Sequence, residues 1–231
     1  MTDPATEPTA TVRVRVWDLP TRAFHWSLVL AVVSLVISAE IGALEWHMRI
    51  GLVVGALLVF RVVWGVVGGH WSRFTSFVRA PGAILRYLKG QAQPGDHFEV
   101  GHNPLGALSV LALLALLALQ VASGLVADDE VATTGPLNRF VSSAVASLAT
   151  GWHAKVGKLI LLGLVLLHVG AIVYHRRKKQ INLVLPMITG DKPLPPDTPA
   201  STDTLATRLR AVALLAACLA LAAWVASLAN P

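Results

Sequence analysis

Three histidines lie in one otherwise apolar stretch of the chain: His153, His168 and His175. An α-helix advances about 100° per residue, so steps of 15 and 7 residues place all three imidazoles on roughly one side of a regular helix. Ionisable groups inside a membrane span are costly and usually mark a functional path. Imidazole is also an axial ligand of haem iron. The stretch therefore predicts an electron-carrying site, provided that other helices supply partner ligands.

Four histidines fall at two matched depths. His47 and His153 each follow a tryptophan at one end of an apolar run, whereas His25 lies near the opposite end of the first run. His168 comes 15 residues after His153, which is about 22 Å along a helix. We expect an outer pair, His47 with His153, and an inner pair, His25 with His168. A lone histidine near a helix end is more often an interfacial residue, but an imidazole flanked only by apolar neighbours, as His168 is, needs a partner or a metal.

His175 is the runner-up for the inner level. It begins the basic run HRRKK, where snorkelling into the headgroups is an adequate alternative explanation.

Small and basic residues extend the candidate site. Gly51 and Gly55 follow His47 at steps of four and would let a flat macrocycle approach the backbone, although helix packing uses the same residues. Arg61 lies at the depth of the inner pair, and its guanidinium would bind carboxylates such as haem propionates. Arg22 could serve similarly, and snorkelling to the surface is the alternative for both arginines.

The composition predicts an all-α membrane protein. Apolar residues make up 55% of the 231 residues and charged residues only 14%, with a mean hydropathy of +0.63. A hydrocarbon core of about 30 Å needs about 20 apolar residues in a helix. Five stretches meet or nearly meet this length: Ala23–Ile41, Met48–Val67, Leu105–Val126, Val156–Tyr174 and Val212–Leu228.

The net charge of +6 reports topology and not nucleic-acid binding. Most of the 19 Lys and Arg residues fall in three segments: the N-terminal arm, the loop after the second span, and the segment between the fourth and fifth spans. Basic loops mark the cytoplasmic side. We therefore expect a multi-pass membrane protein with a cytoplasmic N-terminus and a C-terminus on the outer side, which in a bacterium is the periplasmic side of the inner membrane.

The single cysteine, Cys218, excludes a disulfide within the chain, and there is no C-x-x-C-H motif for covalent haem attachment. Any haem is therefore expected to be non-covalent haem b. The first span follows a polar arm and has no clean A-x-A site, so we do not expect a cleaved signal peptide.

Four segments are expected. They are a cytoplasmic arm at 1–20, a four-helix domain at 21–180, a Pro-rich cytoplasmic linker at 181–207 and an additional C-terminal transmembrane helix at 208–231. Within them, Val12–Pro20 suits a short strand or arm, Gly68–Asn103 an amphipathic interfacial helix, and Leu137–Leu148 a surface helix.

Five motifs, in this order and spacing, resemble the bacterial cytochrome b561 and nickel-hydrogenase cytochrome b family: VWDLPTRAFHW, EWHMRIG, FRVVWGVVG, GHNPLGALSVLALL and GWHAKVGKLILLGLVLLHVGAIVYH. The resemblance runs from about Val12 to Gly190. It implies a four-helix membrane cytochrome with two haem b groups, whose ligands would be His25, His47, His153 and His168. The fifth span departs from this pattern.

The resulting hypothesis is a di-haem b-type cytochrome of a respiratory chain. It would pass electrons between quinone or quinol and a redox partner protein such as a cytochrome c, a hydrogenase or another dehydrogenase. Whether it acts on quinol itself, holds a bound quinone or forms a homodimer stays open. The alternatives are a haem-free transporter or channel that uses the histidines as a proton relay, and a membrane anchor of a redox complex.

Overall fold

The computed structural model describes residues 10–91, 98, 100–131 and 133–229, so the start of the predicted arm lies outside the described residues. Four helices are long and apolar enough to span a membrane: α1 (Leu19–Glu40), α2 (Leu44–Val67), α5 (Pro104–Val126) and α9 (Leu205–Ala226). A fifth candidate span, Ser143–Lys178, joins α6 (Ser143–Gly151) to α7 (Lys158–Lys178). The predicted all-α membrane fold is confirmed, and the chain is a multi-pass membrane protein.

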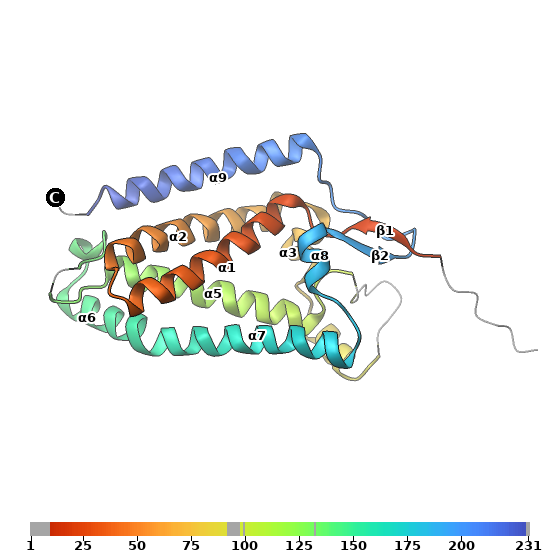
Figure 1. Cartoon of the computed structure of the whole chain (residues 1–231), viewed down its shortest axis with the longest axis horizontal. Coiled ribbons are helices and arrows are strands. Elements are labelled where there is room, and N and C mark those ends of the chain that lie inside the picture. Colours follow the sequence, from red (N-terminus) through yellow and green to blue (C-terminus); the bar gives the residue numbers. More distant parts are fainter. Residues whose placement is uncertain (1–9, 92–97, 99, 132, 230–231) are drawn as a thin grey trace, which may run out of the picture.

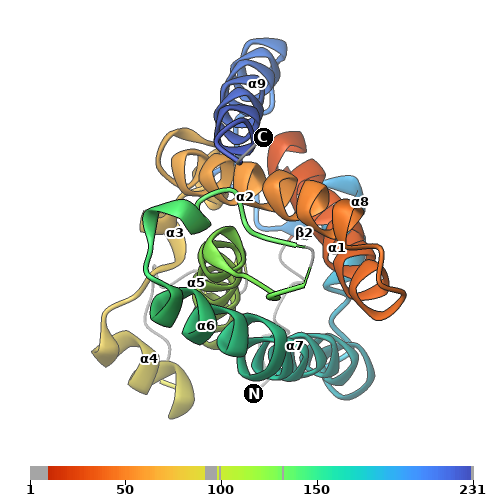
Figure 2. The same ribbon diagram turned by 90° about the vertical axis from the view of Figure 1, so that its left-hand side faces the viewer.

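The long helices run side by side, alternating in direction along the chain (Figures 1 and 2). Gly42, with a φ of 73°, makes the turn between α1 and α2, because glycine adopts this left-handed conformation without strain. α2 packs against α1, α5 and α9, and α5 packs against α7. One end of the bundle carries α6, and the opposite end carries two short strands (Figure 1). We call these the α6 end and the strand end.

Asp18 fastens the start of α1 to the end of α2. Its carboxylate is fully buried and caps α1 by accepting a hydrogen bond from the backbone N–H of Thr21 at 2.8 Å. It also accepts bonds from Trp64 Nε1 at 3.1 Å, from the backbone N–H of Gly69 at 2.9 Å and from Ser72 Oγ at 3.1 Å. A buried carboxylate needs such donors, so this residue fixes how the first two spans meet.

The strand end is closed by a two-stranded antiparallel sheet. β1 (Val12–Arg15) pairs with β2 (Asp191–Leu194), which follows the short helix α8 (Val184–Thr189). The predicted short strand at the start of the chain is therefore present, and its partner comes from the segment predicted as a linker.

Asp203 ties this sheet to α9. Its carboxylate contacts Arg15 at 2.9 Å and Arg208 at 3.0 Å. Burial raises the pKa of Asp203, but hydrogen bonds from Arg208 and from the backbone N–H of Leu19, together with the charge of Arg15, outweigh burial and leave the pKa below 3.8. The sheet, the start of α1 and the start of α9 therefore share one ionic contact.

Short helices follow α2, as expected for the segment 68–103. They are a 3₁₀ turn at His70–Ser72, α3 (Phe74–Phe77) and α4 (Pro81–Leu88). Phe77 is almost fully buried and Phe74 packs edge to face against it, with ring centroids 5.7 Å apart. These short helices lie at the strand end of the bundle.

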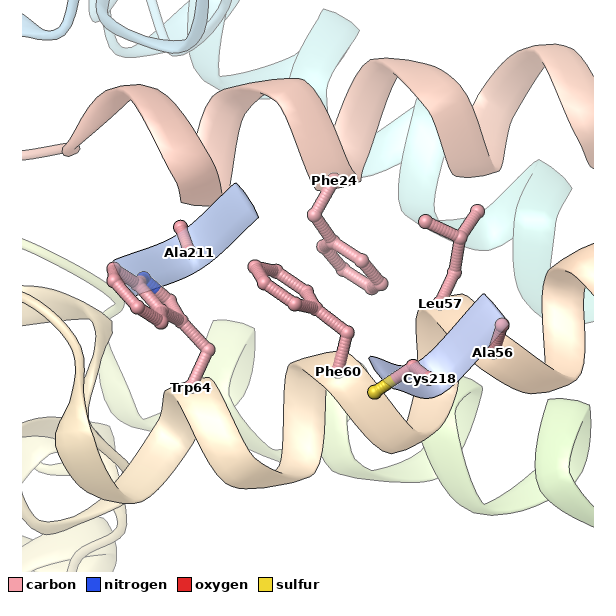
Figure 3. Close-up of a cluster of buried hydrophobic side chains, with 7 residues drawn as sticks. All are labelled: Phe24, Ala56, Leu57, Phe60, Trp64, Ala211 and Cys218. Carbon is pink, nitrogen blue, oxygen red and sulfur yellow. The ribbon is translucent and has the colours of Figure 1, made fainter. Parts of the chain in front are cut away.

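The additional helix α9 packs along α2. Ala211 and Cys218 of α9 lie against Phe60 and Trp64 of α2, with Phe24 of α1 beside them (Figure 3). Further toward the α6 end, α2, α5 and α9 enclose an apolar groove of about 260 Å³. None of the eight histidines is on α9, so this helix supports the bundle without contributing an imidazole.

The fourth span differs from the expectation in one respect. A π-helical turn at Trp152–Gly157 joins α6 to α7 without a break, and the predicted surface helix at Leu137–Leu148 is a 3₁₀ turn at Asn138–Phe140 followed by α6. The regular spacing assumed for His153, His168 and His175 does not hold across this turn, because a π turn takes one more residue than an α turn.

Candidate functional site

His47 and His153 face each other at the α6 end. Their ring centroids lie 5.8 Å apart and their planes are nearly perpendicular, at 89°. His47 is in the first turn of α2 and His153 is in the π turn before α7. The structure therefore brings together the two histidines that the depth argument pairs, from residues 106 positions apart in the sequence.

Both rings are held through Nδ1. His47 Nδ1 lies 3.0 Å from the carbonyl oxygen of Leu35, and His153 Nδ1 lies 2.8 Å from the carbonyl oxygen of Gln120. A carbonyl only accepts, so each Nδ1 carries the hydrogen and donates it. The lone pair is then on Nε2 of each ring, the state in which a neutral imidazole binds a metal.

The π turn is shaped around Gln120 of α5. The Gln120 amide donates to the carbonyl oxygen of His153 at 3.1 Å. A Cβ at Gly157 would run into Gln120 Oε1, and a Cβ at Gly124 would meet His153 Cε1 at 2.9 Å. Both glycines are thus required by the close approach of α5 to the His153 turn.

His25 and His168 influence each other electrostatically, and both influence His102 before α5. His25 and His168 belong to α1 and α7, and both rings are partly buried. His25 Nδ1 is buried without a hydrogen-bond partner among the described residues. A buried, unpaired imidazole nitrogen is costly, so this pair has the character of a ligand set.

His102 lies within electrostatic range of His25 and His168, and it is not among the four histidines expected as ligands. It precedes α5, and its ring packs against those of Trp17 and Phe77, each with centroids 4.8 Å away. Burial, and then the positive charge of Arg61, lowers the pKa of His102 from 6.5 to about 3. The imidazole is therefore neutral at physiological pH. Its ring partners come from residues 25 and 85 positions away, so the local sequence gives no signal of its burial.

Arg61 is the one buried guanidinium of this region among the described residues. It is 3% exposed, its Nη1 has no hydrogen-bond partner among the described residues, and its Cζ lies 4.8 Å from the centre of the Phe74 ring. The cation–π contact replaces part of the hydration that the guanidinium loses on burial. An unpaired N–H on a buried cation suits a carboxylate ligand.

Arg22 and His175 lie in other settings. Arg22 donates to the carbonyl oxygen of Ile188 and is 3.9 Å from Asp203, so its guanidinium is engaged with the strand end. His175 Nδ1 donates to the carbonyl oxygen of Ala171 one turn earlier in its own helix. His175 also lines a small pocket with Tyr87, Asn103 and other residues near the strand end.

The glycines differ in what surrounds them. A Cβ built on Gly51, Gly163 or Gly170 would meet no atom within 4 Å, whereas one on Gly55 would meet Val121 of α5 at 3.3 Å. Gly51 thus leaves its helix surface open to a flat group, and Gly55 permits helix packing beside the apolar groove. No residue of α7 is buried by protein, which is consistent with a helix that faces both lipid and a cofactor.

Fold and site together define a class: a helical membrane protein in which two spans bring imidazoles face to face, a side chain that can bind haem iron. The family model for prokaryotic cytochrome b561 matches residues 16–190, about three quarters of the chain. The chain belongs to this family, and it is a membrane protein of b-type haem electron transfer. The curated proteins contain no match to the chain. The match ends before α9, the helix that also departs from the four-helix pattern.

Proposed function

We propose that the protein is a di-haem cytochrome b that passes electrons across the membrane between a quinone pool and a redox partner protein. The observation that carries the proposal is the His47–His153 pair, whose rings lie 5.8 Å apart with Nδ1 of each bonded to a carbonyl. Two imidazole nitrogens about 2 Å from one metal leave ring centroids about 6 Å apart. The residues present therefore fit an axial ligand pair.

We assign His47 and His153 to an outer haem and His25 and His168 to an inner haem. The four residues would hold both axial positions of each iron, which leaves no open position for oxygen. Bound haem b supplies a one-electron couple in each site. The carbonyl oxygens of Leu35 and Gln120 hold the two outer rings in one tautomer. The 15 residues from His153 to His168 separate the two levels.

Arg61 is our candidate for a propionate contact at the inner site. Its buried Nη1 has no other partner among the described residues, and a guanidinium binds carboxylate in a bidentate manner. Gly51 is our candidate for close contact at the outer site, because nothing would meet its Cβ. The case for haem contact is weaker at Gly55 and Arg22, since both residues make other contacts.

For the quinone, we propose the small pocket beside α7 at the strand end. Tyr87 and Asn103 bring polar side chains there, and His175 and Lys179 lie across from them. The carbonyl oxygens of a quinone ring need hydrogen-bond donors, which Tyr87, Asn103 and Lys179 carry. The one N–H of a neutral His175 ring is already donated to the carbonyl oxygen of Ala171. The basic segments at this end support a cytoplasmic location, with the N-terminus inside and the C-terminus outside the inner membrane.

The test begins with purified protein in detergent. A pyridine haemochrome assay should give b-type haem at two per chain, and redox titration should resolve two components. His47→Ala and His168→Ala should each remove about half of the haem, whereas the matched control His175→Ala should retain both. Protein that folds without any haem would reject the proposal and favour the proton-relay alternative, in which the same substitutions alter flux.

A further inference from the structure

The two outer histidines are held by the same local arrangement, built twice. In α1, the carbonyl oxygen of Leu35 accepts a hydrogen bond from Ser38 Oγ at 3.1 Å and from His47 Nδ1 at 3.0 Å. In α5, Ser123 Oγ lies 2.8 Å from the carbonyl oxygen of Leu119 and 3.0 Å from that of Gln120, so it divides its one hydrogen between them; the Gln120 oxygen also accepts a bond from His153 Nδ1 at 2.8 Å. In each case the serine stands three residues after the carbonyl.

The serine hydroxyls also lie close to the rings themselves. Ser38 Oγ is 3.4 Å from His47 Nδ1, and Ser123 Oγ is 3.4 Å from His153 Nδ1. Both serines are buried, at 5% and 7% exposed. A serine buried inside a membrane span normally only bonds back to its own helix. Here the back-bonded hydroxyl reaches the oxygen that orients a neighbouring imidazole.

This shared oxygen is crowded. A carbonyl oxygen has two lone pairs, and in a regular helix one donor is already the backbone N–H four residues later. The serine hydroxyl and the histidine N–H then compete for the second lone pair of the carbonyl oxygen. The strength of the bond from Nδ1 sets the basicity of the imidazole, since a ring that donates a stronger bond becomes a more basic ligand. A more basic ligand favours the oxidised, more positively charged iron.

We infer that Ser38 and Ser123 are positioning residues that tune the outer haem by limiting the hydrogen bond from each axial imidazole to its carbonyl. The inference rests on the assignment of His47 and His153 as ligands. It adds a specific consequence: the potential of the outer haem would depend on two hydroxyls that act through the carbonyl oxygens orienting the imidazoles. Within the part of the chain that the structure describes, neither His25 nor His168 has such a hydrogen bond from a ring nitrogen.

The experiment is a spectroelectrochemical titration of purified Ser38→Ala, Ser123→Ala and the double variant, with electron paramagnetic resonance of the oxidised protein. Removing one hydroxyl should strengthen the Nδ1–H bond and lower the midpoint potential of the outer haem. We expect about a threefold change in the ratio of oxidised to reduced haem for each serine, on the scale of a modest change in one hydrogen bond. That is about 28 mV, because tenfold corresponds to 59 mV for one electron.

The matched controls are Ser34→Ala in α1 and Ser109→Ala in α5, whose hydroxyls bond to neither histidine within the described residues. The component of the redox titration that is missing from His47→Ala protein is the outer haem.

A fall in midpoint potential that is confined to that component, and is roughly additive in the double variant, supports the inference. Two-haem variants with unchanged potentials and spectra overturn it. If an alanine variant loses haem, the serine is replaced by threonine instead, which keeps the hydroxyl. A threonine variant with the native potential supports the role of the hydroxyl, and a threonine variant that also loses haem overturns it. Wild-type protein without haem rejects the proposed function instead.

Discussion

Gln120 and His153 hold each other at two points. The imidazole donates from Nδ1 to the backbone oxygen of Gln120 at 2.8 Å, and the Gln120 amide donates to the backbone oxygen of His153 at 3.1 Å. One residue of α5 therefore fixes both the orientation of the ring and the course of the backbone that carries it. A π turn leaves some backbone groups without the usual helical partners, and the amide takes up one of them.

Gly157→Ala should damage the outer site selectively. The new Cβ would collide with Gln120 Oε1 and approach Trp152 Nε1 to 2.7 Å, so the π turn must shift and carry His153 with it. We expect loss of about half of the bound haem, measured by the pyridine haemochrome assay. Gly163→Ala is the matched control, since a Cβ there meets nothing within 4 Å. Equal haem content in the two variants would contradict this account of the turn.

Asp18→Ala should lower the stability of the whole bundle. It removes the N-cap of α1 and leaves the buried donors of Trp64 and Gly69 without their acceptor. A lost cap costs about 1 kcal/mol, and each unsatisfied buried donor costs about 1–3 kcal/mol. Thermal denaturation in detergent should show a clear fall in Tm. Asp197→Ala removes an exposed carboxylate from the same end and should leave Tm unchanged; a similar fall there would refute the special role of Asp18.

Acidification should destabilise the protein through His102. Its pKa is about 3 in the folded state against 6.5 when unfolded, so below pH 6.5 the unfolded chain takes up a proton that the folded chain does not. The contribution of this neutral imidazole to stability is therefore complete above pH 6.5 and is lost progressively as the pH falls toward 3.

Melting curves between pH 7 and pH 4 should test this. The His102→Asn variant should show a flatter dependence of Tm on pH than the native chain. His70→Asn, which changes a histidine in edge-to-face contact with the neighbouring Trp71, is the control. Parallel curves for the native and His102→Asn proteins would argue against a buried neutral ring.

Removal of α9 should leave both haem sites in place. A chain ending at Thr204 keeps every histidine and retains Asp203 with its contact to Arg15. The exposed side of Phe60 and Trp64 would then meet lipid or detergent, which solvates apolar groups about as well as another helix does. We expect an unchanged haem count with a lowered Tm. Loss of haem from the truncated chain would make α9 part of the cofactor domain.

Much of this fold was predictable because the relevant signals are lengths and depths along a helix. Apolar stretches long enough for a bilayer located all five spans, and a spacing of 15 residues placed His153 and His168 at different levels. The pairing across helices followed from depth alone. His47 and His153 do face each other in the structure.

The residues around the histidines were harder to predict. Ser38 and Ser123 resemble any small helix residue, and their importance depends on the approach of a second helix. Gln120 had a weak signal, since it is the one amide within the apolar stretch Leu105–Val126. The contact between Arg15 and Asp203 joins residues 188 positions apart, which no local pattern reveals. The π turn could not be predicted from spacing, because an extra residue in one helical turn leaves the apolar pattern unchanged.

The π turn at Trp152–Gly157 makes the angular phase between the two levels depend on a single residue. A π turn holds one residue more than an α turn, and each residue of an α-helix contributes about 100° of rotation. Loss of one residue here would leave His153 anchored by α5 and swing the remainder of α7, His168 included, away from α1. An insertion or deletion in this turn would therefore keep the outer pair, His47 and His153, in place. It would rotate His168 away from His25 and so disrupt the inner pair.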